Sequence, residues 1–98
     1  MIPPVYLGDE VSAAGYRLAG AMVRTPHAGE EAQALRWARS NAPLVLISAA
    51  VAAGVGDAAL RSALSALTPL VLIVPDLAGV VPVPDLAARL RGQLGLEA

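Results

Sequence analysis

The chain has 98 residues, of which eight are acidic and seven are arginine, and its formal net charge is −1. It has no lysine, and its arginines form no basic stripe, which disfavours nucleic-acid binding. It has no cysteine, which excludes disulfide and thiol chemistry. The length fits one domain with one core. The chain is 56% hydrophobic, which indicates that part of its surface is apolar. A partner covers this surface, or it consists of alanine-rich helix faces that are stable in water.

Two strand–helix pairs are predicted in the first half of the chain. A short strand at 4–8 ends at an acidic pair, which suits the positive N-terminal end of a following helix that stops near Gly20. A weaker strand is predicted at 21–25, followed by a turn and a helix at 30–41. The residues expected to face the core are Val11, Ala14, Gly15 and Leu18 in the first helix and Ala28, Ala32, Leu35, Ala38 and Ala42 in the second.

The second half of the chain contains two continuous apolar runs, at 43–48 and 69–75. Such runs predict strands that are buried on both faces of a parallel sheet. Residues 49–56 are ambiguous, because their glycines favour a loop or a frayed turn. Asp57 can cap a third helix, whose core stripe is expected to be Leu60, Leu64 and Leu67.

Strands and helices therefore alternate along the chain, which predicts one α/β domain over residues 1–98. We expect a four-stranded parallel sheet with helices on both faces, in a Rossmann-like or receiver-like topology. Residues 1–75 form this core, and 76–98 are predicted to be a loop followed by a C-terminal helix. No secretory signal peptide is predicted, and the uncharged run at 40–56 is short for a bilayer span.

Ligands in such folds bind beyond the carboxyl ends of the strands, where this chain places Asp9, Glu10, Ser48 and Asp76. Neither a dinucleotide fingerprint nor a P-loop is present, and one histidine without cysteine disfavours zinc. We therefore predict no catalytic residue, no cofactor and no metal. A small enzyme that uses the strand-end cleft stays open as an alternative.

An acidic pair after the first strand is also how receiver domains hold magnesium. Here Ser48 and Ala49 stand where the phosphate-accepting aspartate would be, and the required lysine is missing. A receiver-like signalling or interaction domain without the phosphoacceptor is the other alternative. His27 lies near Glu30 and Glu31, a pair capable of acid–base work if buried, although an exposed turn is the simpler interpretation.

The N-terminal region resembles the signature of the F-subunit family of V/A-type ATP synthases, in which a strand ends in Gly-Asp and a helix carries Gly-aromatic-x-Leu-Ala-Gly. Less specific similarity extends along most of the chain, although Pro3 and Pro4 shorten the first strand and 77–83 is more apolar than is usual in the family. The matching residues are Gly8, Asp9, Gly15, Tyr16, Arg17, Leu18, Ala19 and Gly20, followed by Glu30–Ala32, Leu44–Ser48, Pro69–Pro75 and Asp85–Gly95.

The resemblance implies a non-catalytic rotor protein of the central stalk, cytoplasmic and peripheral to the membrane as part of the complex. Such a protein binds the D-subunit, the coiled-coil shaft of the rotor, helps couple rotation to ion transport and modulates ATP hydrolysis, partly through its C-terminal helix. Trp37, on the polar face of its helix, is a candidate anchor, or it lies flat over its neighbours. The partner-binding residues expected in the last helix are Leu86, Arg89, Leu90, Arg91 and Leu94.

Overall fold

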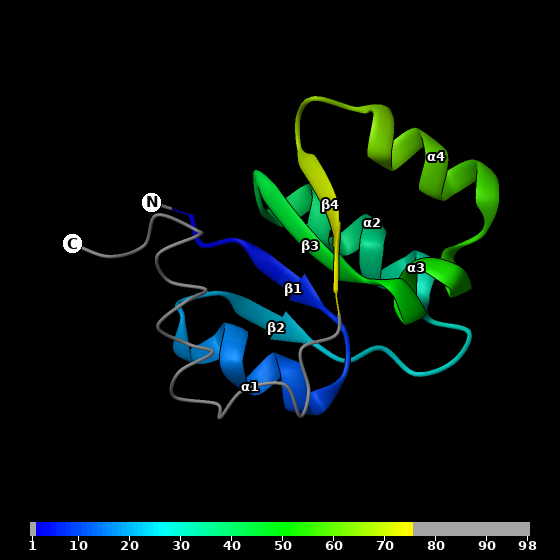
Figure 1. Cartoon of the computed structure of the whole chain (residues 1–98). Coiled ribbons are helices and arrows are strands. Elements are labelled where there is room, and N and C mark those ends of the chain that lie inside the picture. Colours follow the sequence, from blue (N-terminus) through cyan, green and yellow to red (C-terminus); the bar gives the residue numbers. More distant parts are fainter. Residues whose placement is uncertain (1, 76–98) are drawn as a thin grey trace.

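Four parallel strands form one sheet in the order β2-β1-β3-β4 in the computed structural model, which describes residues 2–75 (Figure 1). The predicted fold class is thereby confirmed. The loop and helix predicted for 76–98, with Asp76 and the five partner-binding candidates of the last helix, lie outside the described residues. The elements are β1 (Val5–Leu7), α1 (Glu10–Leu18), β2 (Met22–Arg24), α2 (Glu31–Asn41), β3 (Leu44–Ser48), α3 (Ala49–Val55), α4 (Asp57–Ser65) and β4 (Leu70–Val74).

The strand register brings the carboxyl ends of the strands to the same edge of the sheet. In the central strand, Val5 lies beside Met22 on one side and Val45 on the other. β3 and β4 pair over five residues, from Leu44 beside Leu70 to the last pair of each strand. Because the chain passes from β1 to β2 on one side and returns to β3 on the other, β1 and β3 flank the topological switch point, where folds of this type bind ligands.

One face of the sheet is covered by α2, α3 and α4, as Figure 1 shows. As predicted, Leu35 and Ala38 of α2 and Ala42 just after it are buried, and Ala32 packs against them. Ala28 precedes the helix and is exposed. Alternate residues of the strands meet them, because successive side chains of a strand point to opposite faces. The buried cluster on this face consists of Val5, Leu7, Leu35, Ala38, Ala42, Val45, Ile47, Val51, Ala52, Val55, Ala63 and Val71.

The other face is covered by α1, and here the predicted core stripe is right only for Gly15. Val11 and Leu18 are each 54% exposed, and the helix instead buries Ser12, Ala13, Gly15 and Tyr16 against the sheet. The small residues among these let the helix approach the strands closely. This approach places the Tyr16 ring on the ring of Tyr6, with centroids 4.1 Å apart and planes 12° from parallel. The second buried cluster consists of Tyr6, Ala13, Tyr16, Ala19, Ala21 and Leu46.

The ambiguous segment after β3 is a helix, α3, and not a loop. The Ser48 hydroxyl accepts a hydrogen bond from the Val51 N–H at 3.1 Å and caps the start of this helix. The expected cap of the next helix is also wrong, because Asp57 is the first residue of α4 and Gly56 precedes it as the cap.

The predicted stripe of α4 needs a correction as well. Leu60 packs against the core as expected, but Leu64 is 40% exposed and Leu67, which lies beyond the helix, is 89% exposed. The residue that α4 buries fully is Ala63. A short helix at the end of the sheet contacts the core along a narrow line, so most of its leucines stay at the surface.

Candidate functional site

A cleft of about 320 Å³ lies at the carboxyl ends of β1 and β3, as the topology predicts. The structure brings Gly8 and Asp9 together with Ser48, although these residues lie about forty positions apart in the chain. Pro26 and Glu31 close the side toward α2. The cleft is lined by Gly8, Asp9, Pro26, Ala28, Glu31, Ser48, Ala49, Ala50 and Val51.

The carboxylate of Asp9 is the N-cap of α1. Its Oδ2 accepts a hydrogen bond from the backbone N–H of Ser12 at 2.9 Å. Burial raises the pKa of this carboxyl, but hydrogen bonds from Ser12, from the Asp9 N–H and from Val11 outweigh burial, and the net pKa of Asp9 lies below its ordinary value. The group is therefore an ionised acceptor committed to the helix start.

Replacing Asp9 by alanine is expected to lower the free energy of unfolding by about 1 kcal/mol at neutral pH, the usual cost of losing an N-cap. Because the folded-state pKa is lowered, this contribution is present above the carboxyl pKa of the unfolded chain and is lost as pH falls through the folded value. Urea unfolding should show the difference between parent and variant narrowing in acid.

Asp57→Ala is the matched control, because Asp57 also lies at a helix start but makes no capping hydrogen bond. We expect it to cost a few tenths of a kcal/mol at most, through the weak interaction of a first-turn carboxylate with the helix dipole. Equal losses for the two variants would contradict the capping role of Asp9.

The other polar groups around the cleft also hold the turns in place. Glu31 Oε1 accepts from the Gly29 N–H at 2.8 Å, and Glu10 Oε1 accepts from the Thr25 hydroxyl at 3.2 Å. The buried hydroxyl of Ser48 is the cap of α3. The polar residues at and around this cleft therefore cap helices or stabilise turns through hydrogen bonds.

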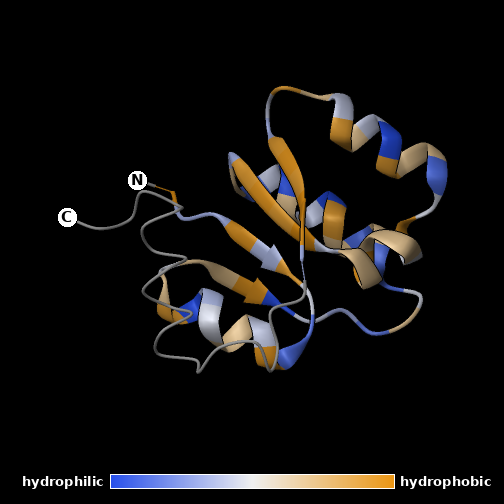
Figure 2. Cartoon of the chain, viewed as in Figure 1, coloured by the Kyte–Doolittle hydropathy of each residue, from blue (hydrophilic) through white to orange (hydrophobic). Residues whose placement is uncertain are grey.

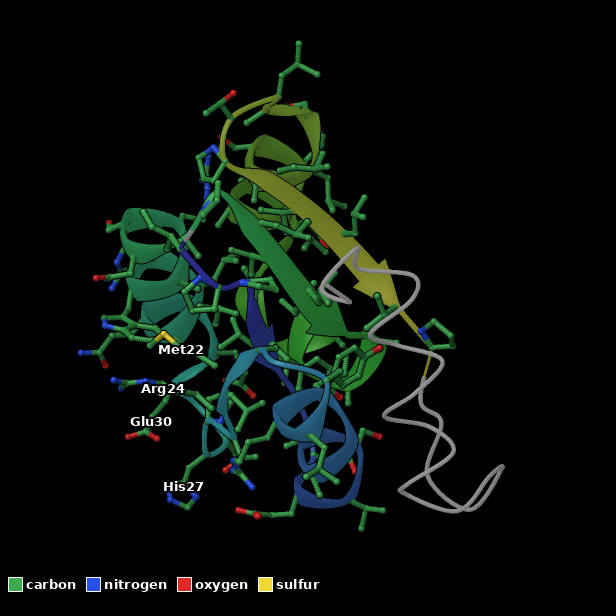
Figure 3. All side chains as sticks on the ribbon, turned by 90° about the vertical axis from the view of Figure 1, so that its left-hand side faces the viewer. Met22, Arg24, His27 and Glu30 are labelled. Carbon is green, nitrogen blue, oxygen red and sulfur yellow. The ribbon has the colours of Figure 1, made fainter. Side chains whose placement is uncertain are left out.

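His27 and Glu30 are joined through the backbone of the histidine. The His27 N–H donates to Glu30 Oε1 at 3.1 Å, and both side chains are exposed. In Figure 3 the side chains of His27 and Glu30 extend outward on the same side of the molecule as those of Met22 and Arg24. This geometry is a turn that precedes α2, as the simpler interpretation of the sequence predicts. Within residues 2–75, no three histidine or acidic side chains converge as a metal site would require.

A larger and more open cleft, of about 560 Å³, lies between β2 and α2. The Arg24 guanidinium lies over the ring of Trp37, with its Cζ 3.7 Å from the ring centroid. Trp37 is half-buried and packs against the core cluster on the α2 face of the sheet. The cleft is lined by Arg24, Thr25, Pro26, Glu30, Gln33, Ala34 and Trp37.

This second cleft offers a flat cation, a carboxylate and an amide, from Arg24, Glu30 and Gln33. The sequence does not predict it, because Arg24 and Trp37 belong to different elements and no local pattern joins them. The only sequence feature that points here is the single tryptophan on α2.

The residues of the Gly-Asp and Gly-Tyr-Arg-Leu-Ala-Gly motif form one structural unit. Gly8 lies against the Tyr6 ring, Asp9 caps α1, and Tyr16 stacks on Tyr6. Gly15 and Ala19 are buried, and Gly20 has a φ of 111° just beyond the helix, a conformation that favours glycine. Arg17 and Leu18 face outward. The motif thus fixes α1 between β1 and β2.

No helix within residues 2–75 combines the length and the apolar character that crossing a bilayer requires. Compared with known proteins, the chain matches no protein-family model, no curated protein and no solved structure.

Proposed function

We propose that this chain is a non-catalytic central-stalk protein like the F-subunit of V/A-type ATP synthases, and that it binds the coiled-coil shaft of the rotor, the D-subunit. The observation that carries the proposal is the outward face of α1. Val11, Ala14 and Leu18 follow one another at spacings of three and four, and the first and last are each 54% exposed. They form an apolar stripe of one heptad, which we call the α1 stripe.

The spacing of the α1 stripe suits a helical partner. Residues at positions i, i+3 and i+7 align along one side of a helix, as do the contact positions of coiled coils. A rigid coiled coil can lay its own apolar residues along such a stripe, whereas an isolated small molecule would find no enclosure there. The stripe exists because α1 turns its small residues and Tyr16 to the sheet.

The polar groups at the strand ends support a binding role over the small-enzyme alternative. Asp9 and Ser48, the residues that a cleft-based enzyme would use, are committed as helix caps. The residues that carry the family resemblance build the scaffold that presents the α1 stripe.

The direct test is calorimetric titration of the full chain with the coiled-coil rotor shaft from the same organism. Saturable one-to-one binding with sub-micromolar affinity is the expected result. Absence of binding, with both proteins folded by circular dichroism, would overturn the proposed function.

Val11→Glu is expected to weaken this binding by at least about tenfold, or about 1.4 kcal/mol, because it places a charge within an apolar contact. Glutamate is a better helix former than valine, so the substitution should not harm α1 itself. Met22→Glu, on the edge strand β2, is the matched control, because Met22 is 44% exposed and lies outside the α1 stripe, and it should leave the affinity unchanged. Equal affinities for Val11→Glu and the parent would remove the α1 stripe from the interface.

A further inference from the structure

The edge of the sheet formed by β4 is the most apolar surface of the described residues. Nine large hydrophobic side chains are exposed within residues 2–75, and five of them fall between positions 64 and 73. Figure 2 shows β4 as a continuous hydrophobic arrow at the end of the sheet opposite β2. The five are Leu64, Leu67, Leu70, Leu72 and Ile73, which we call the β4 edge.

Nothing in the sequence protects this edge from pairing. No charged residue occurs between Arg61 and Asp76, and β4 itself is Leu-Val-Leu-Ile-Val. Within the described residues β4 pairs with β3 alone, so the backbone N–H and C=O groups along its outer side have no strand partner among those residues. Natural edge strands usually carry a charge, a bulge or a proline that discourages further pairing, and the prolines here lie only at 69 and 75.

We propose that β4 pairs with β4 of a second copy of this chain, antiparallel about a two-fold axis perpendicular to the sheet through Leu72. Leu70 then lies opposite the second copy's Val74, and Val71 lies opposite its Ile73. Opposed residues of an antiparallel pair share one face, so each face joins apolar to apolar side chains. The two sheets become one continuous sheet, and the contact is the same surface on both copies.

A strand fits this edge better than a helix. Exposed backbone groups of an edge are satisfied by another strand, whereas a helix laid over Leu70 and Leu72 would cover side chains and leave the edge unpaired. The sequence of the 23 residues after position 75 does not predict a comparable strand, because Gly79, Pro82 and Pro84 interrupt its apolar stretch. The β4 strand of a second copy can pair with the exposed backbone groups of this edge. It also brings apolar side chains and no charge, so it covers the exposed side chains as well.

This inference does not depend on the proposed function, which uses the α1 stripe. Sedimentation equilibrium of the full chain should show an average mass that rises with protein concentration from 9.9 kDa toward twice that value. A single mass of 9.9 kDa at every concentration would overturn the proposal and leave the edge to residues 76–98 or to another protein.

Leu72→Lys should raise the dimer dissociation constant by at least about tenfold, because it opposes two like charges across the axis. Leu72→Glu should do the same, and an equimolar mixture of the two variants should recover the dimer as a mixed pair. Met22→Lys is the matched control, since Met22 lies on the opposite edge strand with 44% exposure against 45% for Leu72. It should dimerise like the parent.

Circular dichroism and thermal unfolding of each variant establish that it is folded before its mass is interpreted. A dimer that survives Leu72→Lys, or one lost equally with Met22→Lys, would overturn pairing through β4. Failure of the Lys and Glu variants to recover the dimer on mixing would overturn the two-fold axis at Leu72.

Discussion

Tyr16→Ala is expected to lower the free energy of unfolding by about 3–5 kcal/mol, the usual cost of removing an aromatic side chain from a core. Tyr16 exposes only 2% of its surface, and Tyr6, on which its ring stacks, is fully buried in the central strand. The pair is the main contact between α1 and the middle of the sheet. Because native domains are stable by only about 5–15 kcal/mol in total, the variant should be largely unfolded at modest denaturant concentrations.

Tyr16→Phe is the control, because it keeps the stacked ring and removes only the hydroxyl. We expect it to cost less than about 1.5 kcal/mol. Urea unfolding followed by circular dichroism compares the variants. If Tyr16→Ala unfolded at the same urea concentration as the parent, the stacked pair would not be part of the stabilising core.

Alkaline pH gives an independent readout of the same site. Burial raises the pKa of the Tyr16 hydroxyl, so the folded state keeps its proton at pH values where the unfolded chain ionises. The parent should therefore lose stability relative to Tyr16→Phe as pH rises above the ordinary tyrosine range, near about 10. An unchanged difference across that range would contradict the burial of the hydroxyl.

The fold could be predicted because its strongest determinants are local in the sequence. The apolar runs at β3 and β4 predict parallel strands that are buried on both faces, and both runs are parallel strands of the sheet. The predicted burial is confirmed for β3 but wrong for β4, because β4 is an edge strand on which Leu70, Leu72 and Ile73 are exposed. The carboxyl-end cleft follows in turn, because parallel topology fixes which residues gather at one edge of the sheet. Asp9 and Ser48 lie at that edge, as the order of strands and helices predicts.

The orientation of α1 could not be predicted, because both of its faces satisfy a helical period. Val11, Ala14 and Leu18 form one apolar stripe, whereas the buried face carries Ser12, Ala13, Gly15 and Tyr16. Hydrophobicity favours the first stripe. The second face is buried because Tyr16 stacks on Tyr6 and because its small residues let α1 approach the sheet closely. No local pattern reveals this stacking, since the two tyrosines belong to different elements.

The helix α3 escapes prediction for a different reason. Gly54 weakens the intrinsic helix propensity of this segment, and seven residues are too few for a clear helical period. The available indication is Ser48 itself, since serine before an alanine-rich run is a typical N-cap. Its position at a strand end favours a functional interpretation instead. The helix forms because Val51, Ala52 and Val55 are buried on the sheet, so tertiary packing overrides local preference.

Gly8→Ala is expected to lower the free energy of unfolding by about 1–3 kcal/mol, because the position has no room for a side chain. A β-carbon built on Gly8 would overlap the hydroxyl and Cζ of Tyr6 and lie 2.8 Å from its Cε2. The Tyr6 ring is fully buried and stacked on Tyr16, so it cannot move aside without disturbing the second core cluster. For a domain of this size the loss corresponds to about 4–8 °C in Tm per kcal/mol.

Gly54→Ala is the matched control, because its β-carbon would also overlap a side chain, the carboxylate end of Glu31. That group is the tip of a flexible side chain near the surface, and alanine favours the helix, so we expect little change in stability. A second comparison places Gly8→Ala in a Tyr6→Phe background, where loss of the hydroxyl removes part of the overlap. The cost of Gly8→Ala should then be smaller, and equal costs in the two backgrounds would show that steric conflict with the Tyr6 hydroxyl is not its cause.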